Sequence, residues 1–159
     1  MKDNQLIREQ LIAVLQKSFA HASFDQAIDQ LDLKSTGIKL PHLPYSIWQL
    51  VEHIRIAQQD IVDFSENKNY KPLNWPEGYW PKETAPENEQ EWKKSLQEIK
   101  QSLASFTTLI NDNQLDLLRP FAHGDGQNLF REALLIIDHL SYHTGQIVLI
   151  RRLLDNWKG

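Results

Sequence analysis

Three histidines are the residues of this sequence best placed to do chemistry together. His139 and His143 lie four residues apart in a proline-free stretch, 128–155, in which apolar residues recur at helical spacing. Residues four apart lie one above the other on a helix, so the two imidazoles can point at a common spot. Both fall on the stripe predicted to face the core, which runs at alternating steps of three and four residues through Ile136, His139, His143, Gln146, Ile150 and Leu153. Each polar ring buried there without a partner would cost about 1–3 kcal/mol. A divalent metal ion is the leading candidate for that partner.

His53 is the candidate third ligand. It follows Leu50 by three residues and precedes Ala57 by four, on the shoulder of the apolar stripe of a predicted helix. Three neutral imidazoles with open positions for water or substrate form a known catalytic metal arrangement. Ligand type alone does not separate zinc, nickel, iron and manganese. The same spacing also fits ordinary core histidines that are hydrogen-bonded to protein groups.

Four more polar residues lie on or near the same predicted helix. Gln146, one turn beyond the second histidine, is the candidate for orienting a substrate or a water; its alternative is a buried amide bonded to a neighbouring helix. Glu132 is either a base near the metal or, as the favoured interpretation, a solvated carboxylate at the end of the helix. Tyr142 and Asp138 should point away from the metal face, toward packing or dimer contacts.

The other histidines and the familiar motifs offer no rival site. His21 and His42 fall at predicted loop positions, where a capping or turn role is expected, and His123 is expected in a solvated turn. The two spaced histidines lack the adjacent glutamate of a zinc protease. The glutamate pattern of diiron bundles, glycine-rich phosphate loops and serine-nucleophile elbows are also absent.

The elements that must position these residues are helices. Ser46 followed by Gln49 is a capping box that marks one helix start. The absence of any strand pattern predicts an all-α four-helix bundle within a single domain, residues 1–159. The four long helices are expected at about 3–20, 46–65, 88–111 and 128–155.

Two irregular segments are expected between these helices. Residues 33–44 read as a connecting loop, and Ser23 can cap a short helix before it. The loop 66–86 is rich in tryptophan, tyrosine and proline. A loop of this length with so many aromatic residues is expected to be either a lid over one end of the core or the wall of a substrate pocket.

Bulk properties narrow the class of protein. The 17 basic and 21 acidic residues give a net charge of −4, and the basic residues are scattered, which disfavours a nucleic-acid surface. The lack of cysteine excludes disulfides and an internal thiol nucleophile and suits the cytoplasm. The charged N-terminus is not a signal peptide, and no apolar run approaches the roughly 20 residues of a membrane span. We therefore expect a soluble cytoplasmic protein that does not contact membranes.

A homodimer is expected from the last helix. Its apolar residues extend all around, since Leu134, Leu135, Val148 and Leu149 lie outside the histidine stripe. A helix of this kind is either central in its fold or covered by a partner.

Three stretches resemble the DinB-like metal-binding family, whose relatives include the YfiT-type proteins. They are residues 21–25 (HASFD), 43–54 (LPYSIWQLVEHI) and 138–146 (DHLSYHTGQ), together with the Trp-Pro loop. The resemblance covers nearly the whole chain. It implies a four-helix bundle, often dimeric, in which His53, His139 and His143 bind a divalent metal.

The resemblance also suggests a reaction. Some relatives are S-transferases that use bacillithiol, and related folds include a mycothiol-dependent isomerase. The main hypothesis is a metal centre that holds a small external thiol as thiolate for attack on an electrophilic substrate. The alternatives are hydrolysis of a small ester or amide by metal-bound water, and a non-enzymatic metal-binding or interaction module. Many relatives carry Arg-x-Gly-Gly-Trp before the second helix, where this chain has 43–48, so its substrate side differs.

Overall fold

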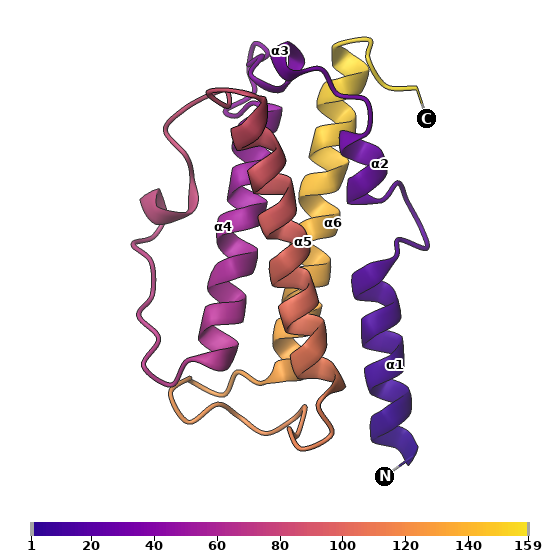
Figure 1. Cartoon of the computed structure of the whole chain (residues 1–159), viewed down its shortest axis with the longest axis vertical. Helices are drawn as coiled ribbons and strands as arrows, with labels where there is room; N and C mark the ends of the chain where they lie inside the picture. The colour runs from indigo at the N-terminus through magenta and orange to yellow at the C-terminus, as the bar shows by residue number, and fades with distance from the viewer. Residues whose placement is uncertain (1, 159) are drawn as a thin grey trace.

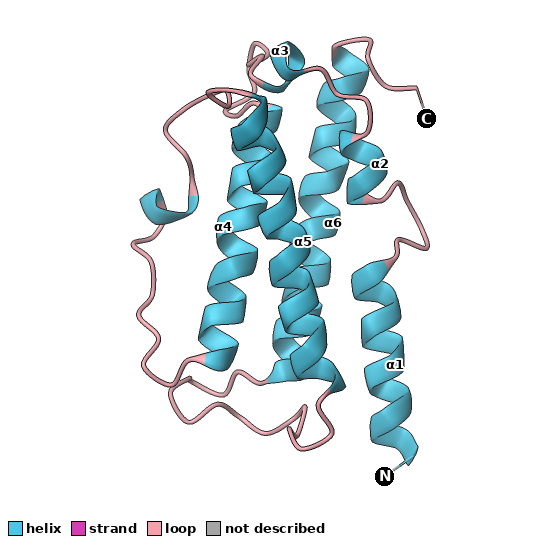
Figure 2. Ribbon diagram, viewed as in Figure 1, coloured by secondary structure: helices cyan, strands magenta, loops and turns pink. Residues whose placement is uncertain are grey.

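The computed structural model describes residues 2–158, and the side chains of residues 4–158; across this range it contains helices and no strand. Four long helices lie side by side in an elongated bundle, as predicted (Figure 1; Figure 2). The helices are α1 (Lys2–Gln16), α2 (Phe24–Ile28), α3 (Leu33–Thr36), α4 (Ile47–Glu66), α5 (Glu89–Asn111) and α6 (Leu129–Leu153), with a short 3-10 helix, η1 (Glu77–Tyr79).

Side-chain caps fix where the three central helices begin. The hydroxyl of Ser46 accepts a bond from the backbone N–H of Gln49, whose side chain accepts one from the backbone N–H of Ser46, each at 3.2 Å. Asn88 and Asn128 cap α5 and α6 through their side-chain oxygens. These bonds satisfy N–H groups that have no partner within the helix, which is why the predicted starts agree with the structure to within one residue.

The first bundle helix is broken, which corrects the prediction of a helix to residue 20. α1 ends at Gln16, and the hydroxyl of Ser18 donates to the backbone oxygen of His21 at 2.6 Å, a local bond that competes with helix continuation. The capping box of Ser23 and Gln26 then starts α2, as predicted. α1 and α2 follow one another along the same side of the bundle (Figure 1).

A second short helix lies where a plain loop was predicted. α3 forms one turn because the side chain of Asp32 accepts a bond from the backbone N–H of Ser35 at 3.0 Å. Aspartate is among the preferred residues at this position, and its bond is enough to hold a single turn.

The core runs along the inner faces of α4, α5 and α6. α4 packs against both α5 and α6, and the largest buried side chains include Phe106, Leu50 and Ile147. One buried charge ties α1 to the end of α5, because the guanidinium of Arg8 donates to the backbone oxygens of Ile110 and Leu115. Carbonyls at a helix C-terminus lack helical partners, so this arginine meets an existing need.

The predicted inward stripe of α6 holds through its middle and fails at its end. Ile136 and Ile150 are buried, whereas Leu153 is 58% exposed. A stripe drawn at alternating steps of four and three drifts by about 20° per heptad on a straight helix. By its last turn the predicted stripe has therefore rotated away from the core.

Among the described residues, α6 is also the helix that is long and apolar enough to cross a membrane. The sequence prediction that no such run exists was therefore too strict. In the bundle, however, the buried residues of α6 include Glu132, His143 and Arg151. The same buried face carries Leu129, Ala133, Ile136, Ile147 and Ile150 and packs on α4 and α2, so α6 is a helix of the bundle core.

Candidate metal centre

Two helices bring the three predicted histidines into one cluster. His53 comes from the middle of α4, and His139 and His143 come from successive turns of α6. One ring nitrogen of each lies within 4.8 Å of those of the other two, and the Nε2 atoms of His53 and His139 are 3.0 Å apart. His53 and His143 are buried, and His139 is half-buried. The contact between α4 and α6 therefore converts two separate sequence signals into one site.

Two of the rings are held with a lone pair free. Nδ1–H of His53 donates to the backbone oxygen of Tyr79 at 2.8 Å, which leaves Nε2 unprotonated in the neutral ring. Nδ1 of His143 bonds the side-chain oxygen of Gln146 at 2.6 Å in the same manner. Metal-binding histidines commonly donate their other N–H to an oxygen in this way, because that bond fixes both tautomer and ring orientation.

The spacing of the nitrogens fits a small cation. Zinc bound tetrahedrally at about 2.0–2.1 Å from each nitrogen requires nitrogens roughly 3.3 Å apart. The contact of 3.0 Å and the limit of 4.8 Å lie on either side of that value. Across this distance Nε2–H of a neutral His139 can donate to the lone pair on Nε2 of His53, or a cation can bind between the two nitrogens. The cluster could therefore hold a metal ion.

Burial keeps the three rings neutral. Burial, and after it the charges that His143 and His53 would carry, lower the pKa of His139 to about 3. Burial also lowers the pKa of His53, against the opposing bond to Tyr79, and the pKa of His143, against the bond to Gln146. Since imidazole binds metals only in its neutral form, no proton has to be displaced from these rings near pH 7.

The loop 66–86 forms one wall of the cluster. Trp80 stacks on the ring of His53, with ring centroids 3.9 Å apart and an interplanar angle of 3°. Tyr45 stacks in turn on Trp80 at 6.0 Å. Of the two roles predicted for this loop, the contacts favour a wall beside the histidines over a lid on the end of the core.

One carboxylate ties this loop to α4. The hydroxyls of Tyr70 and Tyr79 donate to the two oxygens of Asp60, at 2.8 and 2.7 Å. Burial and the bond to Asp60 raise the pKa of Tyr79 to about 12, and the same causes raise the pKa of Tyr70, so both phenols remain donors. The backbone oxygen that holds His53 belongs to this same Tyr79. We call Asp60, Tyr70 and Tyr79 the loop clamp.

The loop clamp is not among the sites predicted from the sequence. The available signal was that Asp60 follows His53 by seven residues, two helical turns, and so lies on a nearby face of the same helix. The positions of Tyr70 and Tyr79 in the sequence do not indicate which carboxylate these tyrosines contact.

Gln146 matches neither of its two predicted roles fully. Its amide is partly buried, but it bonds the histidine one turn before it on its own helix rather than a neighbouring helix. It is therefore placed to orient a ligand ring. Asp138 is exposed, as predicted. Tyr142 is exposed too, but its ring lies against that of His143, with centroids 5.0 Å apart, so it does not point away from the cluster as predicted.

The burial of Glu132 corrects the prediction of a solvated carboxylate. It is 2% exposed rather than solvated, and its carboxylate bonds Arg131 at 2.6 Å. The first turn of α6 is covered by the rest of the bundle, which the position of a residue near a helix end does not indicate. Seven residues of helix separate Glu132 from His139, about 10.5 Å along the axis, so this carboxylate is too far away to be a ligand.

The remaining histidines lie outside the cluster. His21 is exposed and bonds Ser18 and its own neighbour, and His42 is exposed with a φ of 69°, so both have the predicted turn roles. His123 is half-buried rather than solvated, because its Nε2–H donates to the backbone oxygen of Phe64 at 2.8 Å. This bond anchors the 112–128 connection to the end of α4.

A comparison with protein families matches the chain to a model described as the DinB superfamily, over residues 10–147. The matched range includes all three clustered histidines, the loop clamp and most of the four-helix bundle. No curated protein and no solved structure matches the chain. What the site can do is therefore best judged from its own geometry.

Proposed function

Because the chain belongs to the DinB superfamily, we propose that His53, His139 and His143 bind one divalent metal ion and that this centre activates a small external thiol. The observation that carries the proposal is the meeting of three neutral imidazoles, two of them fixed by bonds at Nδ1. When bound, the ion would supply the charge that keeps a coordinated thiol in its thiolate form.

The protein's own residues hold and enclose this chemistry. Tyr79 and Gln146 keep two lone pairs aimed at the centre, and Trp80 covers one face of His53. Tyr142, 63% exposed, lies with its ring 5.0 Å from that of His143, so the cluster borders solvent on this side.

The reaction is an S-transfer. The thiol loses its proton to solvent, its sulfur forms a bond to an electrophilic carbon, and the leaving group departs with the electron pair of the broken bond. The chain has no cysteine, so the nucleophilic sulfur has to come from a small molecule. The reducing cytoplasm, where small thiols stay reduced, is the proposed compartment.

The test combines metal content with thiol consumption. Purified protein is loaded with zinc, nickel, iron(II) or manganese, and bound metal and loss of bacillithiol with a chlorodinitrobenzene electrophile are measured. We expect one ion per chain and thiol loss that depends on the ion. His139→Ala should lose both, whereas His21→Ala, which removes an exposed histidine, should keep both.

Each other outcome contradicts a stated part of the proposal. A fully loaded His139→Ala variant would overturn the ligand assignment. Metal-dependent ester hydrolysis without thiol loss would replace the S-transferase with a hydrolase. Bound metal with neither activity would leave a metal-binding or interaction module.

We also propose a homodimer formed through α6. Leu134, Tyr142, Leu149 and Leu153 are between 47% and 63% exposed on its outer side. Gly145 lies among them, and no heavy atom is within 4 Å of where its side chain would begin, which permits close approach of a second helix. Sedimentation should show a dimer that Leu149→Glu makes monomeric, while Leu118→Glu, at an equally exposed leucine outside α6, should not. A monomeric native protein would contradict the dimer.

A further inference from the structure

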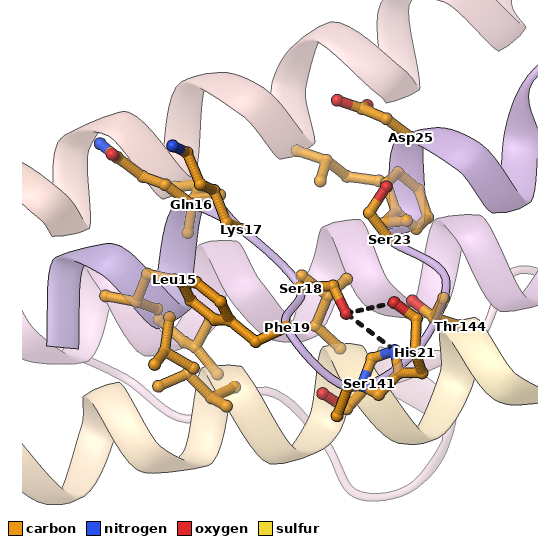
Figure 3. A pocket seen from close by; sticks show the side chains of 18 of the residues that line it. Leu15, Gln16, Lys17, Ser18, Phe19, His21, Ser23, Asp25, Ser141 and Thr144 are labelled. Atoms are coloured by element: carbon orange, nitrogen blue, oxygen red, sulfur yellow. Dashed lines mark hydrogen bonds between the residues drawn. The ribbon is translucent and has the colours of Figure 1, made fainter. Parts of the chain in front are cut away.

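A cavity of about 470 Å³ lies between the end of α1, the link to α2, and the helices α5 and α6 (Figure 3). Its volume falls within the range of about 300–1,000 Å³ that is usual for small-molecule sites. Ile136, Leu140 and Thr144 line it from α6 at steps of four residues. None of the three clustered histidines lines it, because His53 lies on α4 and the other two come from the side of α6 that meets α4. The cavity is therefore separate from the candidate metal centre.

The floor of the cavity is apolar. Ile99, Leu103, Ile136 and Leu140 contribute side chains from α5 and α6, and Leu15 closes one end. Ile99 and Ile136 are each 2% exposed, so they are core residues that reach the cavity wall. The early end of α1 produces this space, since residues 17–20 leave the bundle where a continuous helix would cover the α5–α6 groove. A wall of this composition favours a hydrocarbon ligand.

The rim carries positive charge. Lys17 and Lys100 line it, and among the lining residues that the structure describes Asp25 is the single carboxylate. Asp25 pairs with Lys100 at 3.2 Å, and both side chains are more than 60% exposed, so this pair is weak and can be displaced. The hydroxyls of Ser18, Ser141 and Thr144 belong to the same lining, which Figure 3 shows from close by. The rim is thus locally positive on a chain of net charge −4.

We propose that this cavity binds a medium-chain aliphatic carboxylic acid. The carboxylate lies between Lys17 and Lys100 in place of Asp25, and the hydrocarbon tail lies on the apolar floor. A carboxylate is favoured because a charge-assisted bond to lysine is stronger than a neutral one. A sugar or nucleotide is disfavoured because the isoleucines and leucines of the floor offer its hydroxyls no partners. This site goes beyond the proposed function and does not depend on it.

Calorimetry with two ligands whose alkyl tails differ by one carbon tests the head-group preference. Decanoate and decyltrimethylammonium are titrated into the full chain below their micelle concentrations. We expect saturable binding of one decanoate, and binding of the cationic ligand at least tenfold weaker. Equal binding of the two, or no decanoate binding, would overturn the proposal.

Matched variants test the residues. The double variant Lys17→Gln/Lys100→Gln should weaken decanoate binding about tenfold or more. Lys94→Gln should leave it unchanged, because Lys94 is on α5 but does not line the cavity and is 75% exposed. Asp25→Asn should strengthen binding several-fold, since it removes a competing anion. If the lysine variants bind as the native chain does, the assigned position of the carboxylate is wrong.

Filling the cavity gives an independent check. Ser141 lines it and is only partly buried, so Ser141→Phe can place a ring in the space without displacing a core residue. We expect this variant to lose decanoate binding while keeping its helical circular dichroism and its zinc uptake. Undiminished decanoate binding by the folded variant would show that the ligand binds elsewhere and overturn the proposal. Zinc uptake reports separately on the metal centre.

Discussion

The histidine cluster and the lysine-rimmed cavity occupy two sides of α6 and are built in opposite ways. The cluster joins the middles of two long helices, and bonds at Nδ1 fix two of its three rings. The cavity is bounded by the link between α1 and α2, where Phe19 is 71% exposed and the charged side chains reach solvent. Metal coordination tolerates position errors of only a few tenths of an ångström, so the ligands have to come from rigid helices and be held by supporting bonds. An apolar cavity makes no such demand.

The largest effect should come from the cluster. Zinc at a thousandfold excess over its dissociation constant stabilises the folded chain by about 4 kcal/mol, and His139→Ala should abolish that gain. Thermal unfolding with and without zinc measures it, with His21→Ala as the control. If zinc stabilises His139→Ala as much as the native chain, zinc does not bind at the histidine cluster.

Acid should destabilise the metal-free protein through the same rings. The pKa of His139 is lowered from 6.5 to about 3, so below pH 6.5 the unfolded chain takes up a proton that the folded chain does not. The free energy of unfolding should therefore decrease as the pH is lowered, by about 1.5 kcal/mol from pH 6.5 to pH 5 for this residue alone. Urea unfolding at several pH values measures the slope. His139→Ala should reduce it, and an unchanged slope would show that other groups cause the pH dependence.

The loop clamp should matter next. Asp60→Asn keeps the size of the side chain but weakens its bonds to Tyr70 and Tyr79, and so loosens the carbonyl that orients His53. We expect zinc affinity to fall by about tenfold, the lower end of the usual effect for groups behind a metal ligand. Competition with a zinc chelator measures it. Asp63→Asn is the control, because Asp63 is on the same helix and its carboxylate accepts a bond from Gln59 rather than from a loop tyrosine. Equal losses in both variants would argue against the clamp.

The link should give the smallest effect. Phe19→Ala removes an exposed ring beside the cavity, so the free energy of unfolding should change by less than about 0.5 kcal/mol. Zinc affinity should not change either, since no histidine of the cluster touches the link. Urea unfolding and zinc titration check both points. A large loss of stability would mean that the link is part of the folded core after all.

Local sequence patterns were enough to predict the four long helices and the inward placement of the three histidines. Caps such as that of Ser46 and Gln49 act within one turn, and the period of 3.6 residues decides which side chains share a face. For this reason His53, His139 and His143 could be selected before their distances were known, although the spacing fitted hydrogen-bonded core histidines equally well.

How those rings are held, and what surrounds them, depends on contacts between segments that are distant in the sequence. The bond from His53 to Tyr79 uses a backbone oxygen, which every residue has and which therefore leaves no sequence signature. The burial of Glu132 depends on helices distant in the sequence, and so does the cavity beside the early end of α1. Local patterns fix periodicity and helix starts, whereas contacts between distant segments are set by how the whole chain packs.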